Sequence, residues 1–552
     1  MSLLSRFVNR TEFNSYEDFY KNFKLELPEH FNFTYDVVDV YAKEEPDRVA
    51  LVWCNDYNEE QVITFKDLAQ RTNRVANMFL KQGIGRGDKV ILIMKSRHEF
   101  WPCILAIHKI GAIVIPATHM LKDRDLVYRI KKGKIKALVA IDTRDLLQQI
   151  DEAQEETGDI LKFKFSVGVK RDGWLSYEEE FNASSPEFTP VKRELRNKNT
   201  DAMLIYFTSG TSGFPKMVAH NFTYAAAHIM TGKYWLCGRE NELHYTVADT
   251  GWGKAVWGKL YGQWLAGAQV FVYDYDKFSA DNMLKKLISH KVSTFCAPPT
   301  IYRFLIKEDL TKYDLSCLHY TCVAGEPLNP SVYNTFKEKT GLELKEAYGQ
   351  TELVVSVANW PWITPKPGSM GKPSPGYHID LLDAEGHKVE IGEEGEMCLQ
   401  VDKELPPGIF IDYHDDKEMT DSAWHDGYYH TGDVAWCDED GYFWFVGRAD
   451  DVIKSSGYRI GPFEVESVLM QHPAVMECAI TGAPDPVRGQ IIKATIVLTN
   501  GFTPSEELKT EIQKFVKSHT APYKYPRLVE FIKEMPKTIS GKIRRTAIRH
   551  GN

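Results

Sequence analysis

Residues 64–141 alternate between helical and strand patterns, and this alternation is the strongest constraint on the fold. Apolar residues recur at helical spacing over 67–81, a continuous apolar run follows over 90–94, and another helix and strand complete the segment. A chain that repeats helix and strand in this way builds a layered α/β domain. Further strands are predicted over 202–207, 269–273, 294–297 and 320–323, and a further helix over 280–290. We therefore predict an α/β fold for most of the chain.

The pattern changes after residue 368, and it changes again near residue 450. Beyond 368 the chain has short β-like runs separated by polar turns such as DAEG (383–386) and DEDG (438–441), which predict a β-rich subdomain. The 552 residues exceed what one hydrophobic core usually holds. We predict a large N-terminal domain over 1–449, with layered sheets and the β-rich subdomain. A small α+β C-terminal domain is predicted over 450–552, where helix and strand patterns of its own recur.

Composition narrows the class of protein and its compartment. The net charge of -9 disfavours a general nucleic-acid binder. The nine cysteines form no CxxC pair and no disulfide-like spacing, which favours a reducing compartment. The longest apolar segment, over 104–117, is interrupted by His108 and Lys109 and is too short to span a membrane, and residues 1–15 lack the apolar stretch of a secretory signal. We expect a cytoplasmic protein without a transmembrane segment or a nucleic-acid partner.

A loop rich in hydroxyls and glycines follows the strand predicted over 202–207. Its sequence is TSGTSGFPK (208–216). Glycines let backbone N–H groups approach phosphate oxygens, hydroxyls add donors, and the lysine brings a mobile positive charge. A Walker A loop needs glycine directly before its lysine and serine or threonine after it, whereas this chain has Pro215 and Met217. The loop therefore predicts phosphate binding outside the P-loop class.

These nine residues resemble the phosphate loop of adenylate-forming enzymes, which include acyl-CoA synthetases, peptide-synthetase adenylation domains and luciferases. Five further blocks of that family follow in order: AGEP (324–327), YGQTE (348–352), YHTGD (429–433), GRAD (447–450) and PKTISGK (536–542). For Asp433 and Arg448 alone the alternative is surface turn residues, because Gly-Asp and Gly-Arg pairs are common in loops. Because the ordered set spans most of the chain, we identify the chain as resembling this family.

The resemblance implies a nucleotide site and its metal. The implied ATP contacts are Thr208, Ser209, Gly210, Thr211, Ser212, Gly213, Lys216, Gly325, Glu326, Pro327, Glu346, Ala347, Tyr348, Gly349, Gln350, Thr351, Asp433, Arg448, Arg459 and Lys542. In the family these positions border adenine, bind the ribose hydroxyls and contact the phosphates. Thr351, Glu352 and Lys542 are the implied catalytic residues. Thr211 and Glu352 would hold Mg²⁺, an ion that prefers a few carboxylates together with phosphate oxygens.

Three segments resemble the medium-chain acyl-CoA synthetase branch: ADTGW (248–252), GSMGKPSP (368–375) and APYKYPR (521–527). The implied acyl pocket consists of Trp252, Gly349, Val354 and Val355. The implied CoA contacts are Ser456, Gly457, Tyr458, Arg488, Lys517, Tyr525 and Arg527. Asp450 is the implied hinge of a mobile C-terminal domain. For the valines the alternative is core packing, and for the basic residues it is a solvated surface.

The predicted function is an ATP-dependent acyl-CoA synthetase. It would convert a carboxylic acid, ATP and CoA into acyl-CoA, AMP and pyrophosphate through an acyl-adenylate, with Mg²⁺ bound. The expected acids are medium-chain, branched or aromatic. Two alternatives stay open: an enzyme that loads acyl groups onto a carrier protein, and a noncatalytic sensor of acyl groups or nucleotides that retains the fold.

Overall fold

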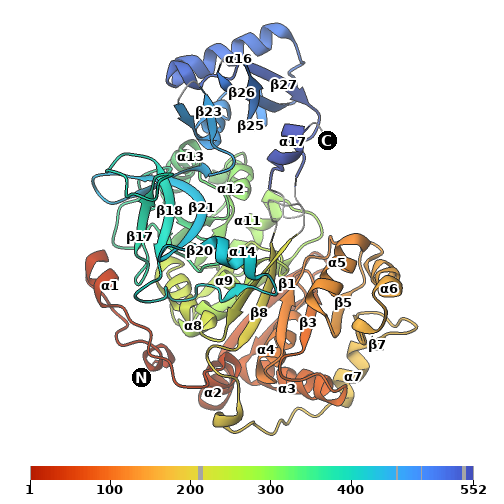
Figure 1. Cartoon of the computed structure of the whole chain (residues 1–552). Coiled ribbons are helices and arrows are strands. Elements are labelled where there is room, and N and C mark those ends of the chain that lie inside the picture. The colour runs from red at the N-terminus through yellow and green to blue at the C-terminus, as the bar shows by residue number, and fades with distance from the viewer. Residues whose placement is uncertain (1, 209–214, 456–457, 487, 538–541, 551–552) are drawn as a thin grey trace.

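Two large sheets hold most of the chain, and a separate body with its own sheet and helices lies at its C-terminal end (Figure 1). The computed structural model describes residues 2–208, 215–455, 458–486, 488–537 and 542–550. The predicted mixed α/β fold, with layered sheets, a β-rich subdomain and a small C-terminal domain fold, is confirmed. In the described ranges no helix is long and apolar enough to cross a membrane.

The first sheet has nine strands, and its central strands run parallel. In spatial order the strands are β16 (Lys372–Pro373), β15 (Val357–Ala358), β14 (Leu344–Tyr348), β13 (Tyr320–Ala324), β12 (Thr294–Ala297), β10 (Leu243–Thr246), β11 (Gln269–Asp274), β1 (Val49–Asn55) and β2 (Glu60–Thr64). Parallel neighbours place the carboxyl ends of successive strands at one edge, which is where ligands usually bind in open α/β sheets. The YGQTE block begins at that edge, at the last residue of β14.

The second sheet has eight strands. In spatial order they are β19 (Asp412–Tyr413), β9 (Lys216–Asn221), β8 (Ala202–Thr208), β4 (Ile113–Pro116), β3 (Lys89–Ile93), β5 (Ala137–Ile141), β6 (Phe163–Val167) and β7 (Leu175–Ser176). Strands β8 and β9 are antiparallel neighbours, and the predicted phosphate loop connects them. Strand β19 pairs with β9 and so brings a segment from far along the chain to this loop.

Apolar residues alternate across the strands and so build three cores. In β3, Val90 and Leu92 face a core that both large sheets share, whereas Ile91 and Ile93 face a core on the opposite side. In β11, Val272 faces the shared core and Phe271 faces a third one. Because side chains alternate faces with a period of two, a strand that is apolar throughout is covered on both sides. The helices provide this cover.

The α-helices are α1 (Tyr16–Asn22), α2 (Asp39–Glu44), α3 (Phe65–Lys81), α4 (Phe100–Lys109), α5 (Asp123–Gly133), α6 (Leu146–Thr157), α7 (Tyr177–Ala183), α8 (Thr223–Ile229), α9 (Gly253–Lys259), α10 (Tyr261–Leu265), α11 (Ala280–Ser289), α12 (Pro299–Leu305), α13 (Pro330–Thr340), α14 (Lys417–Ala423), α15 (Pro462–Leu469), α16 (Glu506–His519) and α17 (Arg545–His550). Their starts follow local chemistry. The Thr64 side chain accepts a bond from the Asp67 backbone N–H, and the Asp67 carboxylate caps Thr64 in return. This capping box begins α3 close to the predicted position.

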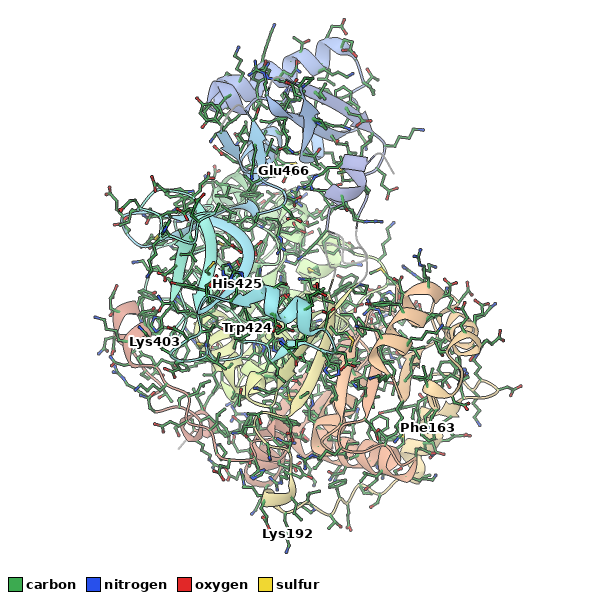
Figure 2. All side chains as sticks on the ribbon, in the orientation of Figure 1. Phe163, Lys192, Lys403, Trp424, His425 and Glu466 are labelled. Atoms are coloured by element: carbon green, nitrogen blue, oxygen red, sulfur yellow. The ribbon has the colours of Figure 1, made fainter. Side chains whose placement is uncertain are left out.

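The β-rich subdomain is a five-stranded sheet. Its strands are β17 (Ile379–Leu382), β18 (Gly395–Gln400), β21 (Tyr428–Cys437), β20 (Trp424–His425) and β22 (Phe443–Arg448), the last of which pairs with β21. Trp424 and His425 of β20 lie near the middle of the molecule, where this sheet meets the large ones (Figure 2). The sheet therefore carries both the YHTGD and the GRAD blocks toward the carboxyl edge of the first sheet.

The C-terminal body has its own sheet and its own core. The strands are β24 (Tyr458–Ile460), β23 (Ile453–Ser455), β26 (Gly489–Leu498), β25 (Val475–Asp485) and β27 (Leu528–Ile532), which pairs with β26. Glu466 on α15 accepts bonds from Arg545 Nη2 at 2.7 and 2.8 Å and from the Ile480 backbone N–H. Arg549 pairs with Asp451. Glu466 lies at the lower end of this body (Figure 2). These ionic contacts tie the last helix, α17, to the first residues of the body.

Candidate active site

The base of the predicted phosphate loop is a hairpin joined to a buried carboxylate. Thr208 at the end of β8 lies opposite Lys216 at the start of β9. Lys216 Nζ donates to Tyr413 Oη at 3.3 Å, and Tyr413 Oη donates to Glu352 Oε1 at 2.9 Å. Strand β19 supplies this tyrosine by pairing with β9. The structure therefore brings two of the predicted residues, Lys216 and Glu352, together through a hydroxyl. Residues 209–213 of the predicted set lie outside the described ranges.

Three predicted nucleotide residues converge on Asp433. Its Oδ2 accepts bonds from Tyr348 Oη and Gln350 Nε2, both at 2.6 Å, and Arg448 Nη1 lies 3.4 Å from its Oδ1. Asp433 and Arg448 are direct partners across β21 and β22. The carboxylate is 4% exposed, and these partners offset the cost of burying its charge. The two motif blocks and the end of β14 thus meet at one carboxylate.

The AGEP block forms an open turn after β13. Gly325 has φ +105, and a Cβ built there would meet no atom within 4 Å. Glu326 accepts a bond from the Thr300 hydroxyl at 3.2 Å, and Arg303 Nη2 lies 3.7 Å from the same carboxylate. Just after Pro327, the Leu328 backbone N–H donates to Glu346 Oε1 at 3.0 Å. This turn therefore borders free space on one side and is held to β14 on the other.

Glu346 is buried in β14 and is a pH-sensitive support of this turn. Burial raises its pKa to about 8, and the bond from the Leu328 N–H only partly opposes that shift. The side chain is therefore mostly a neutral acid at pH 7. Its Oε2 has no hydrogen-bond partner among the described residues. Ala347, the next predicted residue, is buried beside it.

Replacing Glu346 with glutamine should remove a pH dependence of stability. The folded pKa, about 8, lies above the ordinary 4.5, so the stability that the neutral acid confers is fully present below 4.5 and is lost as the pH rises through 8. In that window the wild type should lose up to about 1.4 kcal/mol per pH unit through this group. The melting temperature of the variant should therefore rise relative to wild type between pH 5 and pH 8. The exposed Glu338→Gln variant is the control, and equal pH profiles for all three proteins would contradict this role.

Thr351 is positioned through its backbone by a neutral histidine. His220 Nε2 donates to the Thr351 carbonyl oxygen at 2.7 Å. Burial lowers the pKa of His220 to about 4, so one ring nitrogen carries a proton at pH 7 and the other does not. The ring stacks on Tyr224 with centroids 3.9 Å apart. The His220 ring thus fixes the backbone of the loop that joins β14 to the buried Val354 and Val355.

A buried lysine, Lys254, contacts the AGEP turn and is affected by the charge of Lys542. Lys254 Nζ donates to the Ala324 carbonyl oxygen at 2.7 Å. Burial lowers the pKa of Lys254, and the positive charge of Lys542 lowers it further. The charge of Lys542 thus acts on a lysine that is bonded to the AGEP turn.

Of the predicted acyl residues, Gly349 and Val354 lie together against one unpredicted tryptophan. A Cβ at Gly349 would lie 2.4 Å from Trp257 Cη2 and 2.6 Å from the Val354 carbonyl oxygen, so glycine is required there. Val354 and Val355 are fully buried. Trp252 is half-buried and directly precedes α9. The tryptophan that contacts Gly349 is Trp257, which lies within α9.

Three of the predicted CoA residues form one cluster on the C-terminal body. Lys517 Nζ lies 5.5 Å from the centre of the Tyr525 ring, and Arg527 Nη1 donates to Tyr525 Oη at 2.8 Å. Tyr458 stacks on Tyr523 with ring centroids 4.0 Å apart. The Arg488 backbone N–H donates to Asp485 in the turn between β25 and β26. Ser456, Gly457 and the Arg459 side chain lie outside what the structure describes.

Comparison with known proteins identifies this arrangement. Residues 38–403 match the family described as AMP-binding enzyme, and residues 464–542 match the AMP-binding enzyme C-terminal domain. The chain belongs to the AMP-binding enzyme family. Human mitochondrial acyl-coenzyme A synthetase ACSM3 is 40% identical over 555 residues, covering 98% of this chain and 94% of that protein. Rat mitochondrial acyl-coenzyme A synthetase ACSM4 is 42% identical over 533 residues, covering 95% and 91%.

Among solved structures, this AMP-binding enzyme is similar to the anthranilate CoA ligase AuaEII in complex with anthranoyl-AMP. The TM-score is 0.85 at 29% identity, covering 95% of this chain and 98% of that one. The predicted membership of the adenylate-forming family and the resemblance to acyl-CoA synthetases are confirmed. The predicted cytoplasmic location is wrong, because the curated relatives are named as mitochondrial proteins. All nine cysteines are free in the structure, and free thiols do not specify a compartment.

Motif reasoning missed several residues of this AMP-binding enzyme. Tyr413, Lys254, Trp257 and His220 all contact predicted residues, yet none belongs to a block that the sequence singled out for its role. Lys254 follows the ADTGW block by two positions, which is a weak signal. Tyr413 reaches Glu352 across 61 positions, so only the pairing of β19 with β9 reveals the contact.

Proposed function

We propose that this AMP-binding enzyme is an ATP-dependent acyl-CoA synthetase acting on medium-chain, branched or aromatic carboxylic acids. The observation that carries the proposal is a pair of buried carboxylates beside the end of β14. Asp433, the predicted ribose anchor, accepts bonds from Tyr348 and Gln350, and Glu352, the predicted Mg²⁺ ligand, accepts one from Tyr413. The names of the relatives and the anthranoyl-AMP complex of a similar structure support it.

In the first half-reaction the substrate carboxylate attacks the α-phosphorus of ATP. A bond forms between a carboxylate oxygen and this phosphorus, and the bond to the β-phosphate oxygen breaks, which releases pyrophosphate. Negative charge spreads over the phosphoryl oxygens during this step. Lys542 would neutralise that charge, while the Thr351 region and Asp433 hold the nucleotide in line.

The buried Glu352 is suited to be a Mg²⁺ ligand. It offers a carboxylate beside the base of the phosphate loop, with Tyr413 Oη as its side-chain donor and Lys216 one contact further. Hard oxygen ligands of this kind suit Mg²⁺, which retains waters and shares phosphate oxygens. When bound, the ion would neutralise phosphate charge. Glu352 and, by resemblance, Thr211 would hold it.

In the second half-reaction the CoA thiol attacks the acyl carbonyl of the mixed anhydride. A carbon–sulfur bond forms, the acyl–phosphate bond breaks, and AMP leaves. We place the domain boundary between residues 449 and 450. We propose that the C-terminal domain rotates about Asp450 between the two steps. The cluster of Lys517, Tyr525 and Arg527 supports a role in CoA binding, because cations and an aromatic face suit phosphates and an adenine ring.

Replacing Tyr413 with phenylalanine should slow adenylation. The change removes the hydroxyl that joins Lys216 to Glu352 and leaves the carboxylate without that donor. A hydrogen bond to a charged group contributes about 1.5–3 kcal/mol, so kcat/KM for pyrophosphate release should fall by about 10–100-fold. Tyr442→Phe, which removes a hydroxyl bonded to the Thr364 carbonyl oxygen away from the site, is the matched control. An unchanged rate in a folded Tyr413→Phe protein would exclude the hydroxyl from the reaction.

The proposed function is tested by a pyrophosphate-release screen over short, medium, branched and aromatic acids, with free CoA present and acyl-CoA detected by mass. Pyrophosphate and acyl-CoA together support the proposal. Pyrophosphate without acyl-CoA would favour loading of a carrier protein. Absence of pyrophosphate with every acid would favour a noncatalytic sensor.

A further inference from the structure

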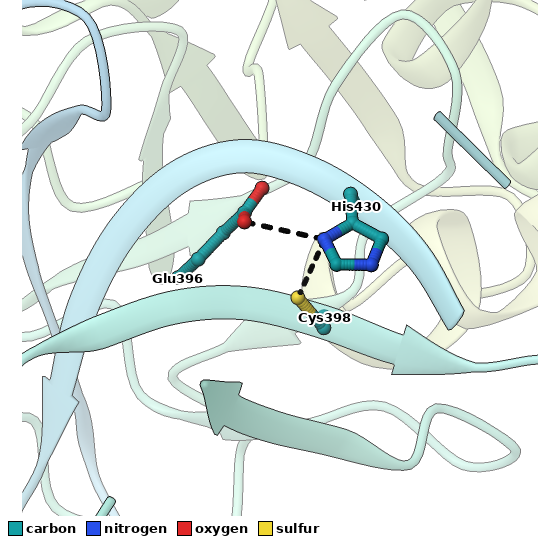
Figure 3. A group of neighbouring side chains, drawn as sticks. All are labelled: Glu396, Cys398 and His430. Atoms are coloured by element: carbon teal, nitrogen blue, oxygen red, sulfur yellow. Dashed lines mark hydrogen bonds and ion pairs between the residues drawn. The ribbon is translucent and has the colours of Figure 1, made fainter. Parts of the chain in front are cut away.

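Within the described ranges, three side chains of different chemistry converge on the β-rich sheet. Glu396 and Cys398 come from β18, and His430 comes from β21 (Figure 3). Glu396 and Cys398 are two positions apart and so project from the same face of their strand. His430 is the direct partner of Cys398 across the antiparallel pair. The pairing of the two strands is irregular between Glu396 and Cys398, and across this irregularity it brings a carboxylate, a thiol and an imidazole together.

The separations of the three groups match those of metal ligands. His430 Nδ1 lies 3.2 Å from Glu396 Oε2 and 3.4 Å from Cys398 Sγ, and all three ligand atoms lie within 4.8 Å of one another. Tetrahedral zinc with ordinary bond lengths separates nitrogen from oxygen by about 3.3 Å and nitrogen from sulfur by about 3.6 Å. The two separations from Nδ1 agree with this geometry to within about 0.2 Å. The carboxylate oxygen and the sulfur lie within 4.8 Å of each other, so side-chain rotation would bring all three onto one ion.

One proton on Nδ1 fully satisfies only one of these contacts. Nδ1 of His430 either carries a proton, which it donates to one partner, or lacks one and accepts from the thiol. The contacts to Glu396 and Cys398 therefore compete for the same nitrogen. Nε2 of this ring is buried without a hydrogen-bond partner in the described part of the chain, so no protein group there fixes the proton on Nδ1. A cation between the three groups satisfies the nitrogen, the sulfur and the oxygen at once.

The surroundings hold the ligands in place and keep the site reachable. The Gly432 backbone N–H donates to Glu396 Oε1 at 3.0 Å, which leaves Oε2 for the imidazole side. The His425 ring stacks on the His430 ring with centroids 3.8 Å apart. Cys398 is fully buried, whereas the side chains of His430 and Glu396 are 17% and 30% exposed. Supported ligands with one open side are the arrangement of a three-ligand metal site with room for water.

The neighbouring strand adds negative charge. Asp380 on β17 is the direct partner of Cys398 on the other side of β18. Its carboxylate is bound by Lys388 Nζ at 2.9 Å and by the side chains of Gln400 and Tyr428. Glu396 and Asp380 thus outnumber the one lysine at this face, which favours a cation.

We propose that Glu396, Cys398 and His430 form a binding site for a divalent transition metal ion of borderline softness, with Zn²⁺ as the best fit. Thiolate and imidazole ligands select zinc-like ions, whereas Mg²⁺ and Ca²⁺ prefer oxygen ligands throughout. The site is separate from the Mg²⁺ position at Glu352, because its ligands project from β18 and β21 and include no residue of the YGQTE block. It does not depend on the proposed enzymatic function.

The test is metal binding to the full-length, chelator-treated protein without nucleotide. Zn²⁺ is titrated against a chromophoric chelator, and Co²⁺ serves as a spectroscopic probe that shows a thiolate-to-metal charge-transfer band when sulfur is a ligand. Wild type should bind one Zn²⁺ at this site and show the cobalt band. Cys398→Ser should lose the band and weaken Zn²⁺ binding by more than about 100-fold, since even supporting residues contribute 10–100-fold. Excess Mg²⁺ should not compete.

Cys437→Ser is the matched control, because it removes a more accessible thiol from the same strand as His430 and should leave both readouts unchanged. Glu396→Gln keeps an acceptor for the Gly432 N–H and leaves the Cys398 thiol in place. It should weaken Zn²⁺ binding while retaining the cobalt–thiolate band. A thermal melt of each variant confirms folding. The proposal is overturned if wild type shows no cobalt–thiolate band, or if Cys398→Ser binds Zn²⁺ as wild type does.

Discussion

Replacing Lys542 with alanine should reduce acyl-adenylate formation by about 10²–10³-fold, the usual effect of removing one charge-stabilising group from a transition state. The charge of Lys542 contributes to lowering the pKa of the buried Lys254, which donates to the AGEP turn. Conversion of supplied acyl-adenylate to acyl-CoA should be much less affected, because no pyrophosphate leaves in that step. Pyrophosphate release and thioester formation are measured separately.

Lys533→Ala is the control for this experiment. It removes an exposed lysine from the segment after β27, in the same C-terminal body. Its rates should equal those of wild type. If Lys542→Ala slowed both half-reactions equally, the lysine would serve the second step as well or would support the structure, and the assignment to adenylation would fail.

Replacing Asp433 with alanine should raise KM for ATP by on the order of 10²-fold or more, because the carboxylate predicted to accept bonds from the two ribose hydroxyls disappears. Tyr348 and Gln350 would lose their common acceptor, and Arg448 would lose its partner. The ribose would lose its predicted carboxylate. Isothermal titration with ATP and steady-state kinetics give the affinity and the KM.

A folding defect is the competing explanation for Asp433→Ala, because Tyr348 is left with a buried hydroxyl. Asp433→Asn keeps a carbonyl acceptor for this hydroxyl and separates the two effects: it should restore the melting temperature but only part of the ATP affinity. Asp440→Ala removes an exposed aspartate from the turn between β21 and β22 and should change neither quantity. Full ATP affinity in a folded Asp433→Ala protein would show that the ribose binds elsewhere.

Most of the secondary structure was predictable because it follows from local periodicity. Strand β12 has the predicted bounds, and β11 and helix α11 differ from them by one residue. Short-range alternation and end capping determine such elements without reference to the rest of the fold. The nucleotide residues were predictable by resemblance, since their motif blocks are continuous in sequence.

The residues that sequence reasoning missed depend on strand pairing between distant segments. Tyr413 meets Glu352 only because β19 joins the edge of the second sheet. Cys398 meets His430 across 32 positions, and a shift of one residue in register would turn one of them to the opposite face. Register of this kind is set by the packed core, so single-chain patterns do not reveal it.

The link between the two ends of the C-terminal body has a mechanical consequence. Arg549 in the last helix pairs with Asp451, and Arg545 joins Glu466 and lies 3.8 Å from Asp451. Lys542 lies three residues before that helix, whereas Asp451 directly follows the predicted hinge residue Asp450. The start of the body and its last helix are therefore joined directly. A rotation about Asp450 would move the segment of Lys542 through these ionic contacts as well as through the packed core.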